Sequence, residues 1–136
     1  MLRLQFADGR GIDSPALRWQ LNSPRAKSLT LWLEAPHADR PRVYWLVFNL
    51  PAHDGELDAR NRHLPPGARL GTNSFGSAVY LSPCVEQGAA GPFRFCLAAV
   101  DAVLPLSEGV SLRQVQKAMH EHVLERAALD VACGGP

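Results

Sequence analysis

The feature that most limits the fold of this chain is a short, nearly unbroken run of apolar side chains in its first half. Residues 43–50 read Val-Tyr-Trp-Leu-Val-Phe-Asn-Leu, and Pro51 directly follows them. A run of this length is typical of a strand that is covered on both faces. Nowhere does the chain hold the roughly 18 uninterrupted apolar residues that a membrane-spanning helix needs. The sequence therefore predicts a central buried strand and no membrane span.

Further strands are predicted on both sides of this segment. Residues 92–100 alternate, with aromatic and aliphatic side chains on one face and Arg94 and Cys96 on the other. Other β-prone segments are residues 2–6, 17–21, 29–33 and 79–81. Several short strands separated by turn signals are typical of a β-sandwich. Residues 51–75 form a long polar connection, and a loop of this length in a compact domain is usually functional or mobile.

The last quarter of the chain changes its period. Ser111 and Gln114 have the spacing of a capping box, and apolar residues then recur three and four positions apart from Leu112 onward. This pattern predicts one amphipathic helix over residues 112–129. A chain of 136 residues can bury about two-thirds of its surface in one domain. We therefore expect a single domain over residues 1–136, a mainly β, antiparallel β-sandwich with peripheral helices and this C-terminal helix.

Charge and cysteine content exclude several classes of protein. Basic residues exceed acidic ones by only one, so the chain lacks the charge that drives nonspecific binding to nucleic acid or anionic membrane. Cys84, Cys96 and Cys133 are odd in number and show no Cys-x-x-Cys spacing, which argues against a disulfide framework and a Cys-rich zinc site. Cys96 lies in an apolar run and is expected to be a buried, inert thiol. The N-terminus carries no export pattern, so a reduced, cytoplasmic protein is expected.

Signatures of catalysis are missing as well. The chain contains no Gly-x-Ser-x-Gly, no Gly-Lys-Ser/Thr phosphate loop and no His-Glu-x-x-His. His120 and His122 are two positions apart, so they cannot form the i, i+4 pair of a zinc-binding helix. We therefore expect a protein that is not an enzyme and uses no cofactor or metal.

Six short motifs follow one another along most of the chain. They are Ser-Pro-Ala-Leu-Arg-Trp at 14–19, Tyr-Trp-Leu-Val-Phe-Asn-Leu-Pro at 44–51, Gly-Thr-Asn-Ser-Phe-Gly at 71–76 with Ser-Pro-Cys at 82–84, Phe-Arg-Phe at 93–95, Ala-Ala-Val-Asp at 98–101, and Met-His-Glu-His-Val-Leu at 119–124. In this order they resemble motifs of the phosphatidylethanolamine-binding protein family, also called Raf kinase inhibitor-like proteins, and especially its bacterial branch. The resemblance implies a β-sandwich with peripheral helices.

Members of that family carry a small pocket for phosphate or a phosphorylated head group at one end of the sandwich. Its wall includes an Asp-Pro-Asp turn, a His before Trp, a Gly-Pro-x-x-Pro loop, and the His and Tyr of a His-Arg-Tyr motif. The resemblance assigns the corresponding places here to our candidate ligand-binding residues, which are His37, Tyr44, Trp45, Ser82, Pro83, Phe93, Arg94 and Phe95.

Most of these positions have changed their chemistry. Tyr44 stands in place of the His, His37 in place of the second Asp, and Phe93 and Phe95 in place of the His and Tyr. Hydrogen-bond donors are thereby lost and apolar surface is gained, and a phosphate without partners would be costly to desolvate there. Of the charged set, Arg94 is retained. We infer that the usual head-group pocket is degenerate or has been repurposed.

Each candidate also has a purely structural interpretation. Arg94 is either an anion anchor or one half of an ion pair with a carboxylate such as Glu34 or Asp101. Tyr44 either donates its hydroxyl to a ligand or packs in the core. His37 either lies in the pocket or is a solvated loop residue.

Three functions therefore remain open. The first is a non-catalytic or regulatory module that binds a small anionic, phospho-head-group-like or apolar ligand. The alternative is a protein–protein interaction module with a vestigial pocket; members of the bacterial branch are often dimers, so the resemblance allows a homodimer. The third is a hydrolase-like or regulatory activity through His37 or through Cys84 as a reactive thiol at the pocket mouth.

Overall fold

The computed structural model describes residues 1–8, 11–13, 15–36, 42–60, 63–85 and 92–133. The strands are β1 Arg3–Phe6, β2 Ala16–Gln20, β3 Ser28–Ala35, β4 Arg42–Leu50, β5 Gly55–Asp58, β6 Arg69–Leu70, β7 Phe93–Val100 and β8 Val123–Val131. The helices are the 3-10 helix η1 Pro83–Val85 and the α-helix α1 Leu112–Met119.

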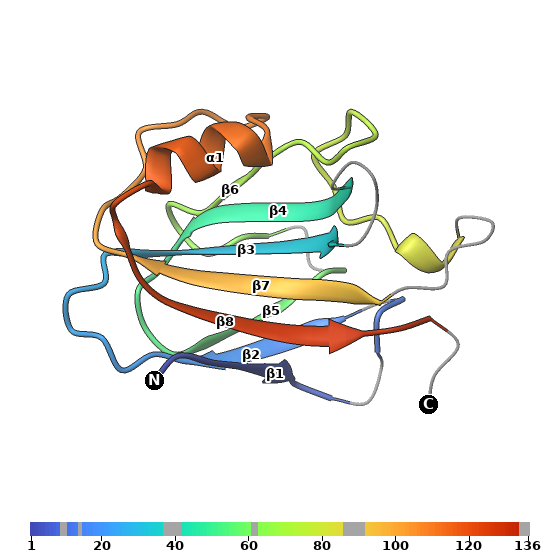
Figure 1. Cartoon of the computed structure of the whole chain (residues 1–136), viewed down its shortest axis with the longest axis horizontal. Helices are drawn as coiled ribbons and strands as arrows, with labels where there is room; N and C mark the ends of the chain where they lie inside the picture. Colours follow the sequence, from blue (N-terminus) through green and yellow to red (C-terminus); the bar gives the residue numbers. More distant parts are fainter. Residues whose placement is uncertain (9–10, 14, 37–41, 61–62, 86–91, 134–136) are drawn as a thin grey trace.

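Two antiparallel sheets form the molecule (Figure 1). One has three strands in the order β1-β2-β5, and the other has five in the order β6-β4-β3-β7-β8. In Figure 1, α1 lies above β4 and β6, while β1 and β2 lie below β8. The predicted mainly β, antiparallel sandwich is confirmed, and among the described residues one α-helix stands where peripheral helices were predicted.

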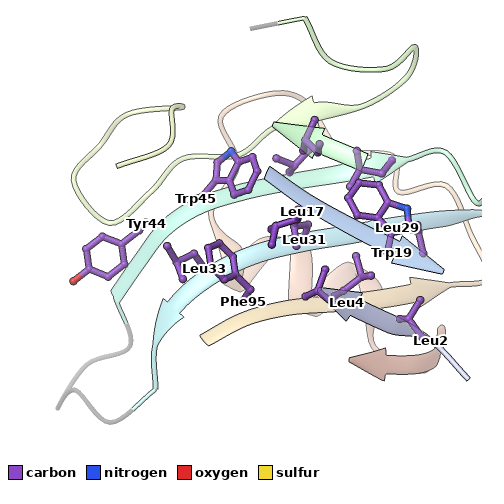
Figure 2. Close-up of a cluster of buried hydrophobic side chains, with 14 of the residues drawn as sticks. Leu2, Leu4, Leu17, Trp19, Leu29, Leu31, Leu33, Tyr44, Trp45 and Phe95 are labelled. Carbon is purple, nitrogen blue, oxygen red and sulfur yellow. The ribbon is translucent and has the colours of Figure 1, made fainter. Parts of the chain in front are cut away.

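The sandwich core lies between the inner faces of the two sheets. Alternate residues of β3, namely Leu29, Leu31 and Leu33, are fully buried there, as the period of a strand requires. Leu17 and Trp19 of β2 cover them from the three-stranded sheet (Figure 2). This contact holds the two sheets together.

A second core lies on the outer face of the five-stranded sheet. Leu46 and Phe48 of β4 pack there with Val115 and Met119 of α1. Trp45 of the same strand belongs to the sandwich core instead. The prediction that residues 43–50 are covered on both faces is therefore confirmed, and α1 supplies part of the second cover.

The predicted helix over residues 112–129 is wrong in its second half. The capping box of Ser111 and Gln114 is present, but α1 ends at Met119. Glu121 has a left-handed backbone with φ of 69°, which interrupts the helix, and β8 then pairs with β7 from Val100↔Val123 to Phe93↔Val131. Side chains of β8 alternate between half-buried and exposed from Glu125 onward. Pairing with β7 overrides the helix propensity of this segment.

Two other predictions need correction. Residues 79–81 form no strand, although the Leu81 amide donates to the Tyr44 carbonyl at 3.0 Å. The long connection over residues 51–75 contains β5, which completes the three-stranded sheet, and β6, which pairs with β4. Short strands such as these lack an apolar pattern of their own and depend on a neighbouring strand. Within the described residues, no helix has the length and hydropathy to span a membrane.

Asn49 closes the end of β4. Its backbone is left-handed, with φ of 57°, and its side chain is buried. The Nδ2 group donates to the Leu104 carbonyl at 2.9 Å, and Oδ1 accepts from the Leu104 amide at 2.8 Å. One side chain thus satisfies both backbone groups of a buried residue that lies 55 positions away.

Replacing Asn49 with Ala is expected to lower the free energy of unfolding by about 2–4 kcal/mol, because it leaves buried backbone groups unpaired and removes the side-chain hydrogen bonds that offset the cost of the left-handed backbone. Urea unfolding followed by circular dichroism measures this. Asn49→Gly loses the same hydrogen bonds, but glycine adopts the left-handed backbone conformation without strain. It should therefore be less destabilised than Asn49→Ala. An Asn49→Ala protein as stable as the parent would contradict this account.

Candidate functional site

An aromatic cluster of Tyr44, Phe75 and Phe93 lies at the end of the sandwich where β4 and β7 begin. The Tyr44 ring centroid is 5.7 Å from that of Phe93, nearly perpendicular to it, and 5.7 Å from that of Phe75. Tyr44 and Phe93 are buried, whereas Phe75 is 50% exposed. Tyr44 lies at the edge of the sandwich core, with its hydroxyl directed away from Trp45 (Figure 2). The cluster therefore has two buried rings, which we call its floor, and one half-exposed ring, that of Phe75, which we call its open wall.

Asn73 organises the loop that carries Phe75. Its buried side chain accepts from the amides of Phe75 and Ser77, at 2.9 and 3.1 Å, and donates to the Val79 carbonyl at 3.1 Å. These local bonds replace regular secondary structure in this segment. They hold Phe75 in a defined place beside Tyr44.

Two further residues fix this loop to the sheet. Ser74 exchanges two hydrogen bonds with the backbone of Val43, at 2.7 and 2.8 Å. Gly71 passes so close to its neighbours that a Cβ would lie 2.8 Å from the Val110 carbonyl oxygen, a distance that no side chain tolerates. The Gly-x-Asn-x-x-Gly pattern noted in the sequence therefore has a structural cause.

A second set of contacts, made by Tyr80 and Ser82, lies next to the aromatic cluster. The Tyr80 ring packs edge-on against Trp45 at 5.3 Å, and its hydroxyl donates to the Ile12 carbonyl. Burial, and to a lesser extent the nearby Asp13 carboxylate, raise the pKa of Tyr80 above its ordinary value. The Ser82 hydroxyl donates to Asp13 Oδ1 at 2.8 Å. These bonds join the N-terminal segment to the loop before η1.

Cys84 and Cys133 form a disulfide, so the predicted reduced state and the reactive Cys84 thiol are both overturned. The bond joins η1 to the chain two residues beyond β8, across 49 positions of sequence. The odd cysteine count and the spacing did not reveal it. The pair becomes adjacent because residues 123–131 form a strand, where the sequence indicated a helix up to residue 129.

Arg94 lies on the opposite face of the sheet from the aromatic cluster. It alternates along β7 with Phe93 and Phe95, which face the sandwich core. Its guanidinium donates to Asp130 of β8, with Nε 2.7 Å from Oδ1, and this hydrogen bond raises the pKa of Arg94. The ion-pair interpretation of Arg94 is therefore confirmed. Its ion-pair partner is Asp130, which is neither of the two example carboxylates, Glu34 and Asp101.

The structure thus divides the eight candidate residues. Tyr44 and Phe93 belong to the aromatic cluster, and Phe75, which sequence reasoning missed, joins them. The other candidates lie elsewhere: Trp45 and Phe95 in the sandwich core, Ser82 directly before η1, Pro83 at the start of η1, and Arg94 on the outer face of β7. His37 falls outside the described residues. The Gly-x-Asn-x-x-Gly pattern around Phe75 was the signal that could have singled it out.

Cys96, the free thiol, lies beside a cavity of about 340 Å³ on the outer face of the sheet. Its Sγ donates to Glu34 Oε1 at 3.1 Å, and the Trp32 indole donates to the same oxygen at 3.0 Å. Burial raises the pKa of Cys96 well above its ordinary value, the bond to Glu34 raises it further, and the nearby Arg94 lowers it slightly. The thiol is therefore a poor nucleophile near neutral pH. Among the described residues, no group of three or more His, Cys, Asp or Glu is placed to hold a metal ion.

The molecule has two antiparallel sheets, a helix on the outer face of the larger sheet and a loop that packs against an aromatic cluster. These features define a small β-sandwich protein. The sequence model of the phosphatidylethanolamine-binding protein family matches residues 2–133. The chain belongs to this family.

Relatives from an archaeon and from bacteria support the assignment. A UPF0098 protein of Methanothermobacter thermautotrophicus is 37% identical over 126 residues, covering 90% of this chain and 82% of the relative. A UPF0098 protein of Chlamydia pneumoniae is 34% identical over 131 residues, covering 89% and 81%.

Two solved structures share the fold. The crystal structure of a homologue of phosphatidylethanolamine-binding protein from Chlamydia trachomatis superposes with a TM-score of 0.83 at 28% identity, over 99% of this chain and 98% of the other. That of YbcL from Escherichia coli, at 24% identity, gives a TM-score of 0.77 over 93% and 85% of the two chains. The likeness to YbcL concerns the fold alone.

Alkylation of Cys96 by iodoacetamide in the folded protein is expected to keep rising with pH through pH 10. The raised pKa means that the thiolate fraction is still small at that pH, whereas an ordinary thiol, with a pKa of about 8.5, has levelled off. Glu34→Gln should speed the reaction at a given pH, because it removes a carboxylate that disfavours the thiolate. Arg94→Gln should slow it. A rate that levels off near pH 9 would contradict the assignment.

Proposed function

We propose that this chain is a non-catalytic binding module that holds a small, mainly apolar or weakly anionic ligand at the aromatic cluster. The observation that carries the proposal is the cluster itself. A buried Tyr44 and Phe93 form an apolar floor, and the half-exposed Phe75 stands beside them on a loop that Asn73 holds in place. Aromatic rings arranged in this way offer a ligand contact area at little cost in conformational entropy.

The charge distribution supports an apolar ligand over a phosphate. Arg94, the cation that the sequence singled out, lies on the other face of β7 and is paired with Asp130. Phe93 contributes no hydrogen-bond donor to the cluster. A doubly charged phosphate held against the Tyr44 and Phe93 rings would lose its hydration, and neither Arg94 nor Phe93 would replace the lost partners. We expect the ligand to carry its polar group at one end of an apolar body.

A thermal-shift experiment with phenyl phosphate, benzyl alcohol, phosphoethanolamine and inorganic phosphate at fixed ionic strength tests the proposal. Binding to the native state raises the melting temperature by mass action. The two aromatic compounds are expected to raise it through their rings, with the phosphate of phenyl phosphate left in water, whereas inorganic phosphate and phosphoethanolamine are not. Phe75→Ala should abolish the shift, because it removes the open wall of the cluster.

Val103→Ala is the matched control, because Val103 is also exposed but follows β7 at the opposite end of the molecule. Arg94→Ala should also leave the shift unchanged. A shift with inorganic phosphate that disappears in Arg94→Ala would overturn the proposal in favour of an anion site. No shift with any compound would favour a vestigial pocket.

A second candidate function is self-association through the same loop. Phe75 and Val79 are both about half exposed and lie on one loop, so a second copy of the chain that packs on this loop would bury apolar surface. A homodimer formed there would show a mass that depends on concentration in sedimentation equilibrium. Phe75→Ser with Val79→Ser should then give a monomer, and Val103→Ser should not. A mass that stays monomeric up to millimolar concentration would exclude this function.

A cytoplasmic location is still our proposal, but the Cys84–Cys133 disulfide does not support it. Three reduced thiols were expected, and the Cys84–Cys133 disulfide replaces two of them. Disulfides persist in oxidising compartments, and those of cytoplasmic proteins are usually transient, catalytic or redox-sensing. In a cytoplasmic protein, this disulfide is therefore expected to belong to one of these kinds.

A further inference from the structure

We propose that the Cys84–Cys133 disulfide is a reducible tether, a cross-link that holds the loop around η1 in place next to the aromatic cluster. In this proposal, reduction by a dithiol frees the loop around η1 and weakens ligand binding at the aromatic cluster, while both cores stay folded. The part that concerns the ligand rests on the proposed function.

The position of the disulfide favours this role. Leu81 donates to the Tyr44 carbonyl, and Ser82 donates to Asp13, so the loop is hydrogen-bonded to its surroundings immediately before η1. Cys84 is then bonded covalently to Cys133. The last register pair of β8 is Val131 with Phe93, so Cys133 lies two residues beyond the strand position that pairs with a residue of the aromatic cluster. The bond therefore joins the loop to the strand end that borders the cluster.

Opening this bond leaves the sandwich intact. Cys84 and Cys133 pack against the margin of the sandwich core and are only partly buried, whereas the buried centre of that core consists of other side chains. The ladder between β7 and β8 runs from Val100↔Val123 to Phe93↔Val131 without either cysteine. Reduction is therefore a local event at one end of the molecule.

The chemistry is an ordinary thiol–disulfide exchange. A thiolate of the dithiol attacks one sulfur of the partly exposed pair, the Cys84–Cys133 bond breaks, and a mixed disulfide forms. The second thiol of the reductant then displaces the remaining cysteine. Two electrons and two protons pass to the protein, which ends with two thiols, and the reductant ends as a disulfide.

The third cysteine does not interfere with the exchange. Cys96 alternates along β7 with Phe93, Phe95 and Leu97, which face the sandwich core, so its thiol lies on the other side of the sheet from the disulfide. Its thiol is also bonded to Glu34. Cys84 and Cys133 therefore open and re-form as one isolated pair.

Hydrogen exchange measured by mass spectrometry, with and without dithiothreitol, tests the tether directly. Reduction is expected to speed amide exchange in the segments around Cys84 and Cys133 by at least about tenfold, and to leave β3 and β4 unchanged. Less than a twofold change in both segments would overturn the proposal. Faster exchange throughout the chain would also overturn it, because the bond would then be a staple for the whole fold.

Cysteine variants separate the tether from other effects of the reductant. Cys133→Ser alone, and Cys84→Ser with Cys133→Ser, should reproduce the fast exchange without dithiothreitol. Cys96→Ser should keep the full response to dithiothreitol. Loss of that response in Cys96→Ser would overturn the proposal, because the exchange would then involve the third thiol.

The ligand arm uses phenyl phosphate as the probe. Its dissociation constant, measured by titration calorimetry, should rise at least about fivefold on reduction, in parallel with the faster exchange near Cys84. If amide exchange near Cys84 becomes faster but the affinity for phenyl phosphate stays unchanged, the disulfide does not control binding, and that part of the proposal is overturned. If the probe binds in neither redox state, the proposed function fails, and the exchange measurement alone decides whether the tether exists.

Discussion

Burial of β4 on both faces is the constraint on which the rest of this structure depends. Trp45 faces the sandwich core, whereas Leu46 and Phe48 face the core beneath α1. Burial of each of these side chains contributes about 1.5–3 kcal/mol to the stability of the fold. Exposure of either face of β4 would therefore destabilise the protein. The strand therefore requires the three-stranded sheet on one side and α1 on the other. Its first residues lie where the loop of Asn73 can close over Tyr44.

Strand alternation then decides which side chains can act together. Phe93 and Arg94 are neighbours in sequence, yet they lie on opposite faces of β7. The aromatic face closes one end of the sandwich, and the charged face pairs with Asp130 of β8. The aromatic cluster and the ion pair of Arg94 with Asp130 are thus separated by the thickness of one sheet. The same separation isolates Cys96 from the disulfide.

Agreement between prediction and structure follows from how local the relevant contacts are. The strand at residues 43–50, the alternation of residues 92–100 and the capping box of Ser111 all depend on neighbouring residues, and all three are present. Residues 123–129 carry helix-forming side chains and a compatible spacing, yet they form β8, because β7 offers a full ladder of backbone partners. The candidate site was predicted only in part: Tyr44 and Phe93 meet, but Phe75 was missed and Arg94 faces away.

By itself, the sequence determined the mainly β class, the central buried strand and the order of motifs that marks the family. These are properties of short segments, whose side-chain period and turn residues act locally. Only the tertiary structure decided that β8 completes the five-stranded sheet, that Asp130 pairs with Arg94, and that Cys84 meets Cys133. Arg94 and Asp130 are 36 positions apart in the sequence, and Cys84 and Cys133 are 49 positions apart. Their formation depends on which strand edge is free after folding, a property that no local pattern encodes.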